Sequence, residues 1–216
     1  IDHEILKREL RKKIGCAKTL WLVDLILDNS NQQEEHLAWF PGDDLFTSHE
    51  RRRGLPIGNL TSQLFGNYYL NGLDHFIKET LGCKYYVRYV DDFVVLDDNK
   101  ERLQEIKAAI GSFLQCYRLL LHENKSRVYR TEDGIAFLGH RVFPGFRLIK
   151  SENVRRFRKR LKGMLMEYHT GNMKREDFNA RVRCWFAHIA HSNTWRLRRK
   201  IYISIYGEKT KRKSRA

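Results

Sequence analysis

The spacing of apolar residues predicts mainly helices in the first part of the chain. Apolar side chains recur at helical spacing over residues 3–14, 17–27, 60–81 and 100–117. Asp2 and Asn59 stand just before the first and third of these segments, where a short polar side chain caps a helix N-terminus. Residues 28–58 are polar, charged and irregular, so we expect an inserted loop there.

The stretch KYYVRYVDDFVVL, residues 84–96, contains two β-prone runs that meet at Asp91 and Asp92. This pattern predicts a strand, a tight turn and a second strand. Residues 119–129 and 135–149 predict further short strands. The order of helix, hairpin, helix and strands matches most of a ferredoxin-like split βαβ sheet, so the expected fold class is α+β. The first strand of such a sheet is missing from the pattern.

Beyond residue 149 the pattern becomes helical throughout, and two Gly/Ser/Asn breaks separate its segments. Trp185 and Trp195 are expected in the core of this helical part, and the alternative is that they stack on nucleic-acid bases. The expected helices cover 151–169, 174–191 and 194–205. The expected domains are a sheet-containing domain over 1–149, with the loop 28–58 inserted, a helical domain over 150–207 and a tail over 208–216.

Charge is distributed unevenly along the chain. The whole sequence carries 41 Lys and Arg against 26 Asp and Glu, a net charge of +15. Residues 150–216 hold 20 of the basic and five of the acidic residues, and residues 1–149 hold 21 of each. A neutral body with a strongly basic C-terminal part indicates a polyanionic partner, most simply nucleic acid. For the tail KTKRKSRA, a merely solvated charge run is an equal alternative.

The four cysteines, at positions 16, 83, 116 and 184, form no CxxC pair. Their spacing favours neither a zinc site nor a disulfide framework, and it is typical of a reducing, cytoplasmic protein. The sequence contains neither a signal peptide nor an apolar run of membrane length, so we expect a soluble protein without a membrane partner.

The adjacent carboxylates of Asp91 and Asp92 require an explanation, because like charges at one turn repel each other. A divalent cation removes that repulsion, and Mg²⁺ takes one or two carboxylates together with phosphate oxygens of a substrate. Two such ions activate an attacking hydroxyl and stabilise the leaving oxygen in nucleotidyl transfer. The alternative is ordinary turn chemistry, since acidic residues favour turns.

Several motifs in one order carry a resemblance to a known family. Tyr89-Val90-Asp91-Asp92 between two apolar strands resembles the catalytic hairpin of reverse transcriptases. IDHEIL (1–6) resembles the end of the first metal-binding motif, and GLPIGNLTSQ (54–63), leading into a helix with Asn67, resembles the nucleotide and template pocket. HENKS (122–126) resembles the motif whose lysine lies near the triphosphate, and FLGHR (137–141) resembles the primer grip. The four motifs occur in the order of the family.

The resemblance implies an RNA-directed DNA polymerase with a palm over 1–149 and a helical thumb over 150–207. It implies two Mg²⁺ ions, with Mn²⁺ as a possible substitute, and dNTP substrates. The implied catalytic residues are Asp91, Asp92 and Lys125, of which both aspartates hold the metal. The implied nucleotide and template pocket is formed by Ile57, Gly58, Ser62, Gln63 and Tyr89, and the primer grip by Leu138 and Gly139. The implied contacts to the nucleic-acid backbone are made by Arg155, Arg158, Lys159 and Lys162.

Some of these residues have simpler interpretations. Lys125 at a strand end is commonly just solvated, and Gly139 is compatible with a bulge in an edge strand as well as with close approach of a primer. The run Arg51-Arg52-Arg53 contacts template or triphosphate in one interpretation and faces solvent in the other.

Ile57 and the pair Ser62-Gln63 discriminate among branches of the family, because group II intron enzymes carry Gln and Ser-Pro there. The combination resembles diversity-generating retroelements, whose reverse transcriptases misincorporate opposite template adenines. We hypothesise that an alkyl side chain at Ile57 removes a polar contact worth about 1–3 kcal/mol and so lowers fidelity. The alternative is that Ile57 only packs against the palm.

The resemblance also implies the partners: template RNA, the RNA–cDNA hybrid and a small helical accessory variability protein. It places the first catalytic aspartate upstream of Ile1, so we expect residues 1–216 alone to be inactive. The rival functions are a group II intron or retron type of reverse transcriptase and a non-catalytic, polymerase-derived RNA-binding scaffold.

Overall fold

The computed structural model describes residues 1–30, 38–44, 46–56 and 60–206. The chain forms two compact units, Ile1–Val128 and Tyr129–Ala216. The strands after residue 134 therefore belong to the second unit, whereas the division into functional domains at residue 149 stays a prediction. Both units mix helices with small antiparallel sheets, so the α+β class is confirmed at that level.

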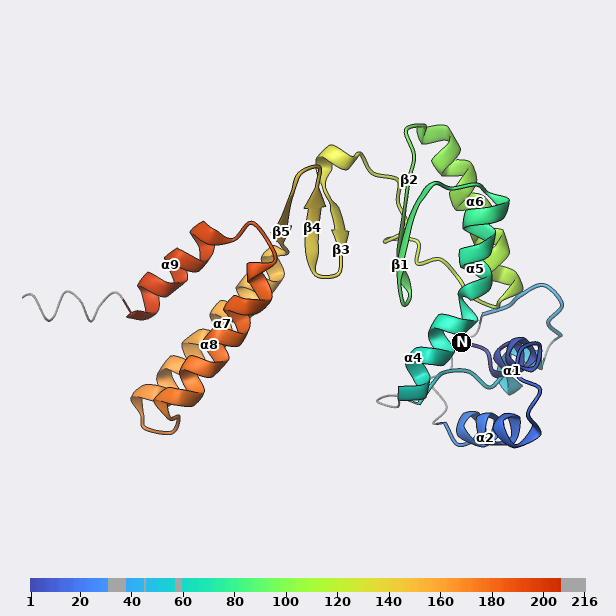
Figure 1. Ribbon diagram of the computed structural model, residues 1–216, viewed down its shortest axis with the longest axis horizontal. Helices are drawn as coiled ribbons and strands as arrows, with labels where there is room; N and C mark the ends of the chain where they lie inside the picture. Colours follow the sequence, from blue (N-terminus) through green and yellow to red (C-terminus); the bar gives the residue numbers. More distant parts are fainter. Residues whose placement is uncertain (31–37, 45, 57–59, 207–216) are drawn as a thin grey trace, which may run out of the picture. The chain divides into compact units, whose positions relative to one another are not determined.

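The first unit is mainly helical and contains one hairpin (Figure 1). Its elements are α1 (His3–Arg11), α2 (Ala17–Asp28), α3 (Thr47–Glu50), α4 (Leu60–Tyr69), α5 (Asn71–His75), the π-helical turn η1 (Phe76–Thr80), β1 (Tyr85–Tyr89), β2 (Asp92–Leu96) and α6 (Lys100–Cys116). The predicted cap at Asp2 is confirmed, because its carboxylate accepts a hydrogen bond from the backbone N–H of Ile5 at 3.1 Å. The other predicted cap, Asn59, lies outside the described residues.

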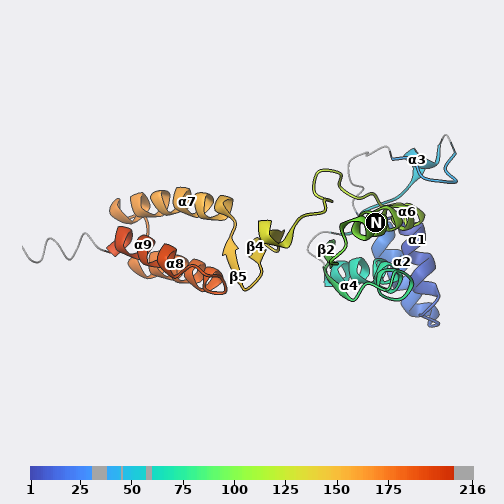
Figure 2. The ribbon, with the colours of Figure 1, turned by 90° about the horizontal axis from the view of Figure 1, so that it is seen from above.

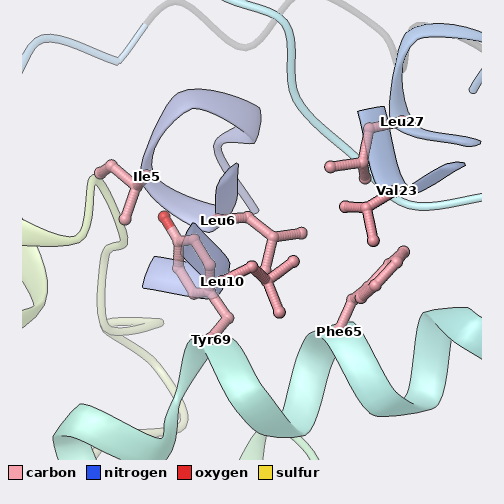
Figure 3. Close-up of a cluster of buried hydrophobic side chains, with 7 residues drawn as sticks. All are labelled: Ile5, Leu6, Leu10, Val23, Leu27, Phe65 and Tyr69. Carbon is pink, nitrogen blue, oxygen red and sulfur yellow. The ribbon is translucent and has the colours of Figure 1, made fainter. Parts of the chain in front are cut away.

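The first core joins α1, α2 and α4 (Figure 3). Side chains from all three helices point into one cluster, as their apolar spacing predicts. The cluster consists of Ile5, Leu6, Leu10, Val23, Leu27, Phe65 and Tyr69.

The segment 60–81 was expected to be one helix, but the structure divides it into α4, α5 and η1. Leu70, between α4 and α5, has φ −90° and ψ 1°. The change of direction lets α4 pack on the first core and α5 on α6. Gly72 allows the second contact, because a Cβ there would lie 2.4 Å from the Tyr117 hydroxyl.

The second core lies between the hairpin and helices α5 and α6. Tyr86, Phe93 and Val95 pack from one face of the hairpin against it. The buried residues are Leu73, Ile77, Cys83, Ile106, Ile110 and Leu114. One face of the hairpin is therefore covered by helices, and this packing holds the hairpin in a fixed position on α5 and α6.

The prediction of a strand over 119–129 is wrong. The chain leaves α6 through Arg118, at φ 50°, and then forms a turn in which the N–H groups of Lys125 and Ser126 both bond the carbonyl of His122. The polar run HENKS satisfies its backbone locally in this way, so no neighbouring strand is needed.

The second unit, as described over residues 129–206, contains a small sheet followed by helices (Figure 2). Its elements are the 3₁₀ turn η2 (Thr131–Asp133), β3 (Ile135–Phe137), β4 (His140–Phe143), β5 (Phe146–Ile149), α7 (Ser151–His169), α8 (Arg175–Ala190) and α9 (Trp195–Tyr206). The strands form an antiparallel sheet in the order β3-β4-β5. The predicted single split βαβ sheet is therefore wrong for the described residues: β1–β2 is one sheet and β3–β5 is another, each built from neighbours in sequence.

The three helices share a core that includes Phe157, Leu161, Phe178, Val182 and Ile201. Trp185 packs against it with its ring stacked on Phe157 at 3.6 Å, so its predicted core position is confirmed. The same prediction for Trp195 is wrong, because this residue begins α9 on the outer side and is 63% exposed. Within the described part of the chain, no helix combines the length and apolar character needed to cross a bilayer.

Candidate active site

The predicted metal-binding acids lie at the tip of the β1–β2 hairpin. Tyr89 pairs with Asp92, so Val90 and Asp91 form a two-residue turn between the strands. Side chains alternate between the faces of a hairpin, and Tyr89 and Asp92 lie on the face that the helices leave uncovered. Asp91 and Asp92 are both exposed, and Tyr89 is exposed beside Asp92, whereas its role in a nucleotide pocket stays a prediction.

Neither carboxylate is neutralised by a neighbouring cation. Among the described residues, no ion pair involves Asp91 or Asp92, and the arginine nearest in sequence, Arg88, bonds to other groups. Exposed, unpaired carboxylates are the hard oxygen donors that Mg²⁺ prefers, and two of them suffice when substrate phosphates supply further ligands. The described residues contain no cluster of three or more His, Cys, Asp or Glu suited to a metal. The residues present thus fit part of a divalent-cation site.

The turn is fastened to the helices by Arg88. Its guanidinium bonds both carboxylate oxygens of Asp74 on α5, one of them at 2.7 Å, and donates to the carbonyl of Val90 at 2.9 Å. It also donates to the side chain of Asn67 on α4 at 3.2 Å. The hydroxyl of Tyr86 donates to the same Asp74 at 2.7 Å. One side chain therefore connects the turn that carries the acids with two helices.

Electrostatics favour this arrangement. The side chains of Arg88 and Asp74 are only 10% and 30% exposed, so the ion pair is partly shielded from water. Burial opposes ionisation of Asp74, but the hydrogen bonds from Arg88 and Tyr86 outweigh it and hold the pKa of this carboxyl below its ordinary value. Burial, followed by the contact with Asp74, raises the pKa of the Tyr86 hydroxyl. Asp74 is thus ionised and Tyr86 neutral around neutral pH.

Val90 has a backbone conformation that its side chain disfavours. Its φ is 56°, whereas among the described residues other than glycine only Arg118 and Leu138 also have a positive φ. A β-branched residue in this region is strained by roughly 1–3 kcal/mol. The bond from Arg88 to the Val90 carbonyl helps to hold this conformation next to the acids.

The predicted nucleotide and template pocket is described only in part. Ile57 and Gly58 lie outside the described residues. Ser62 and Gln63 lie on α4, where the Ser62 hydroxyl donates to the carbonyl of Pro56. A shallow hollow of about 450 Å³ runs along this helix. It is lined by Leu60, Thr61, Gln63, Leu64 and Asn67. Because Arg88 bonds Asn67, the end of this hollow is tied to the hairpin.

Lys125 is exposed in the turn after α6 and not at a strand end. The structure brings it into the same compact unit as Asp91 and Asp92 but shows no bond between them. Its catalytic role therefore stays a prediction.

The predicted primer grip is the β3–β4 turn. Phe137 pairs with His140, so Leu138 and Gly139 form a two-residue turn with φ 46° and 82°. The alternative of a bulge at Gly139 is wrong, because this residue occupies the turn itself. Its carbonyl accepts hydrogen bonds from the N–H of Lys150 at 3.2 Å and from Asn153 at 3.3 Å, so the turn is fixed to the start of α7.

The predicted backbone-binding cations lie together on α7. The helix buries Phe157, Leu161 and Met164 and turns its basic residues to solvent. Within the described residues, none of the four predicted cations is engaged in an ion pair, so all are free to meet phosphates. They are Arg155, Arg158, Lys159 and Lys162.

Arg51 shows what the sequence interpretation missed. Its side chain is 4% exposed and forms ion pairs with Asp2, at 3.3 Å, and with Asp43. Arg118 pairs with Asp2 at 2.8 Å and lies 4.0 Å from Asp43. Arg51 therefore has a structural role that neither earlier interpretation included, whereas Arg52 is largely exposed, as the second interpretation expects.

Arg88 was missed as well, although the sequence contains a usable signal. In the alternating pattern of β1, Arg88 falls on the same face as Tyr86, which is the inward face. A charged residue at an inward position requires a partner. Asp74, on the neighbouring helix α5, is that partner.

Adjacent, exposed carboxylates on the hairpin and a basic helical unit favour a protein class that acts on phosphate-rich polymers. The comparison of sequences makes this specific. Residues 1–142 match the family described as reverse transcriptase (RNA-dependent DNA polymerase), and the chain belongs to this family. No curated protein matches the chain.

Proposed function

We propose that this chain provides the active site of an RNA-directed DNA polymerase centred on Asp91 and Asp92. The observation that carries the proposal is the pair of exposed, unpaired carboxylates on a turn that Arg88 fastens to α4 and α5. A bound divalent cation would be held by both carboxylates and would supply charge stabilisation for the transferring phosphoryl group.

The chain's own residues have separate tasks in this proposal. Tyr89, beside Asp92 on the uncovered face, contacts the incoming nucleotide or template. Lys125 approaches the leaving pyrophosphate as a cation or acid. The turn at Leu138 and Gly139 holds the primer end. The exposed cations of α7 contact the backbone of the RNA–cDNA hybrid, which proteins recognise by its shape and phosphates.

Metal binding by the chain itself is the first test. We expect Mn²⁺, measured by electron paramagnetic resonance, to bind wild type and to be lost in the Asp91→Asn, Asp92→Asn double variant. Asp98→Asn is the matched control, since Asp98 is an exposed acid beyond the end of the same hairpin. Equal Mn²⁺ affinity in wild type and the double variant would remove the metal site from the proposal.

Activity is the second test. Magnesium-dependent extension of a DNA primer on RNA is measured in a form that also carries the upstream aspartate implied by the resemblance. The double variant should lose extension and keep RNA binding. Extension that survives in the double variant would leave the non-catalytic scaffold as the better proposal.

We further propose that the enzyme belongs to the diversity-generating branch and copies adenines with low fidelity, with a small helical accessory protein as partner. The support is the residue combination Ile57 with Ser62-Gln63. The test compares error spectra of wild type and Ile57→Gln on one template. Errors opposite adenine should fall by about 5- to 150-fold if a polar contact worth about 1–3 kcal/mol is restored. An unchanged spectrum would favour a group II intron or retron type of enzyme.

A further inference from the structure

Helix α9 has an outer face that its core contacts do not explain. Leu197, Ile201 and Ile205 pack into the core of the helical unit. Trp195 and Ile203 lie on the opposite side, at a spacing of two helical turns, and are 63% and 54% exposed. Tyr202 borders this side and is 56% exposed. Large apolar side chains thus occupy both sides of one helix.

The same face is basic. Helix α9 exposes Arg196, Arg199 and Lys200 and carries no acidic residue, whereas Arg198 is half-buried. Arg199 lies between Trp195 and Ile203 along the face, and its guanidinium carbon is 5.4 Å from the centre of the Trp195 ring. The face therefore alternates flat aromatic surfaces with cations.

We propose that this face of α9 binds an unpaired stretch of RNA. Unpaired bases stack on aromatic side chains whatever their sequence, and neighbouring cations meet the phosphates. Trp195 and Tyr202 would receive bases, and Arg196, Arg199 and Lys200 would meet the backbone. A duplex offers its bases to no such ring, because they are already stacked on one another.

The comparison with α7 separates this surface from the one expected to meet the hybrid. Helix α7 exposes cations but no aromatic ring to the same degree, since Phe157 is buried and Tyr168 is half-buried. Its chemistry suits a phosphate backbone. The exposed rings of α9 add aromatic surfaces on which the unpaired bases of a single strand can stack.

Other occupants fit the face less well. A second copy would bring the three exposed cations of this face against the same three, which repel each other. A lipid surface favours a helix whose apolar stripe is continuous and whose charges stand at its margin. Arg199 interrupts the stripe at its centre. The inference does not depend on catalysis at Asp91 and Asp92, and its test uses binding alone.

The test uses the 216-residue chain and two fluorescent probes of equal length, an unstructured single-stranded RNA and a blunt RNA–DNA hybrid. Anisotropy should show that the Trp195→Ala, Tyr202→Ala variant binds the single strand about tenfold or more weakly than wild type. Its affinity for the hybrid should stay within about twofold of wild type, because all cations are retained. Tyr202→Phe keeps a flat ring and should retain most of the single-strand affinity that Tyr202→Ala loses.

Trp21→Ala is the matched control, since Trp21 is 65% exposed in the other compact unit. It should bind both probes as wild type does. Equal losses on single strand and hybrid in the double variant, or no loss on the single strand, would overturn the proposal. So would a double variant that keeps RNA binding and loses binding to phosphatidylserine vesicles.

Discussion

Two tight turns of this protein solve one geometric problem in different ways. Both join antiparallel strands through two residues, Val90-Asp91 in the first unit and Leu138-Gly139 in the second. In the second turn both residues have a positive φ, the pattern of a type I′ turn, and glycine occupies the position where it is favoured. In the first turn Val90 has a positive φ and Asp91 does not, a pattern that favours glycine where valine stands.

The supports of the turns differ accordingly. The carbonyl of Gly139 is bonded by Lys150 and Asn153 at the start of α7, and the backbone conformation suits its residue. The Val90 conformation is unfavourable and is held by the side chain of Arg88, which itself depends on Asp74. Both turns are therefore bonded from outside, but only the first has a β-branched residue at a positive φ, which depends on the Arg88–Asp74 network, whereas the second has glycine at one of its two positive-φ positions.

Asp74→Ala breaks the outside support and should have the largest effect. It leaves the Arg88 guanidinium partly buried without its partner, so the free energy of unfolding of the first unit should fall by about 2–4 kcal/mol. Urea denaturation measures this change. Asp98→Ala removes an exposed, unpaired acid and is expected to change stability by less than about 0.5 kcal/mol. A similar loss of unfolding free energy in both variants would show that the Arg88–Asp74 network does not stabilise the first unit.

Gly139→Val places a β-branched residue at a positive φ in the second turn, as Val90 is in the first turn. Because valine disfavours the positive φ of this position, the strain should lower the stability of the second unit by roughly 1–3 kcal/mol. The nearest atom to a new Cβ, the Asn153 amide, is 3.5 Å away, so the cost is in the backbone and not in a clash. Gly139→Asn, which tolerates a positive φ, is the control and should cost less in thermal unfolding. An equal cost for both variants would contradict this explanation.

Val90→Gly removes the strain from the first turn. The free energy of unfolding should rise by about 0.5–1 kcal/mol, since the relief of a left-handed valine exceeds the added chain entropy of glycine. Chemical denaturation of the same unit is the measurement. A loss of stability would mean that Val90 contributes packing that outweighs its strain.

The pH dependence of stability should show the smallest effect. The pKa of Asp74 is lower in the folded chain than in the unfolded one, so its contribution is present above the unfolded value of about 4 and is lost as pH falls through the folded value. Asp74→Asn should therefore flatten the acid side of a plot of unfolding free energy against pH. Asp98→Asn should leave that slope as in wild type.

Local signals predicted much of this structure. The cap at Asp2, helix α6, the hairpin with its two acids and the helices of the second unit all follow from spacing and capping within a few neighbouring residues. The wrong predictions concern partners that are distant in sequence. Strand pairing beyond a hairpin, the buried position of Arg51 and the outward position of Trp195 depend on which surface arrives opposite, and periodicity does not specify that.

The site follows the same division. Asp91 and Asp92 were predicted from the chemistry of a tetrapeptide, and the structure places both acids, exposed, at the tip of the hairpin. Arg88 and Asp74, 14 residues apart, were missed because their importance appears only once the strand alternation is combined with the position of α5. A search for charged residues at inward strand positions would have found this pair.

The quartet of Asp2, Asp43, Arg51 and Arg118 constrains how segments of this protein can be exchanged. Its members come from the chain start, the segment before α4 and the exit of α6, and within the described residues each forms ion pairs with the other members alone. Grafting the segment 38–56 from another member of the family would replace two of the four charges, Asp43 and Arg51, and leave Asp2 and Arg118 without them. Such a chimera should be made by exchanging all four positions together, and swaps of one member alone should yield poorly expressed protein.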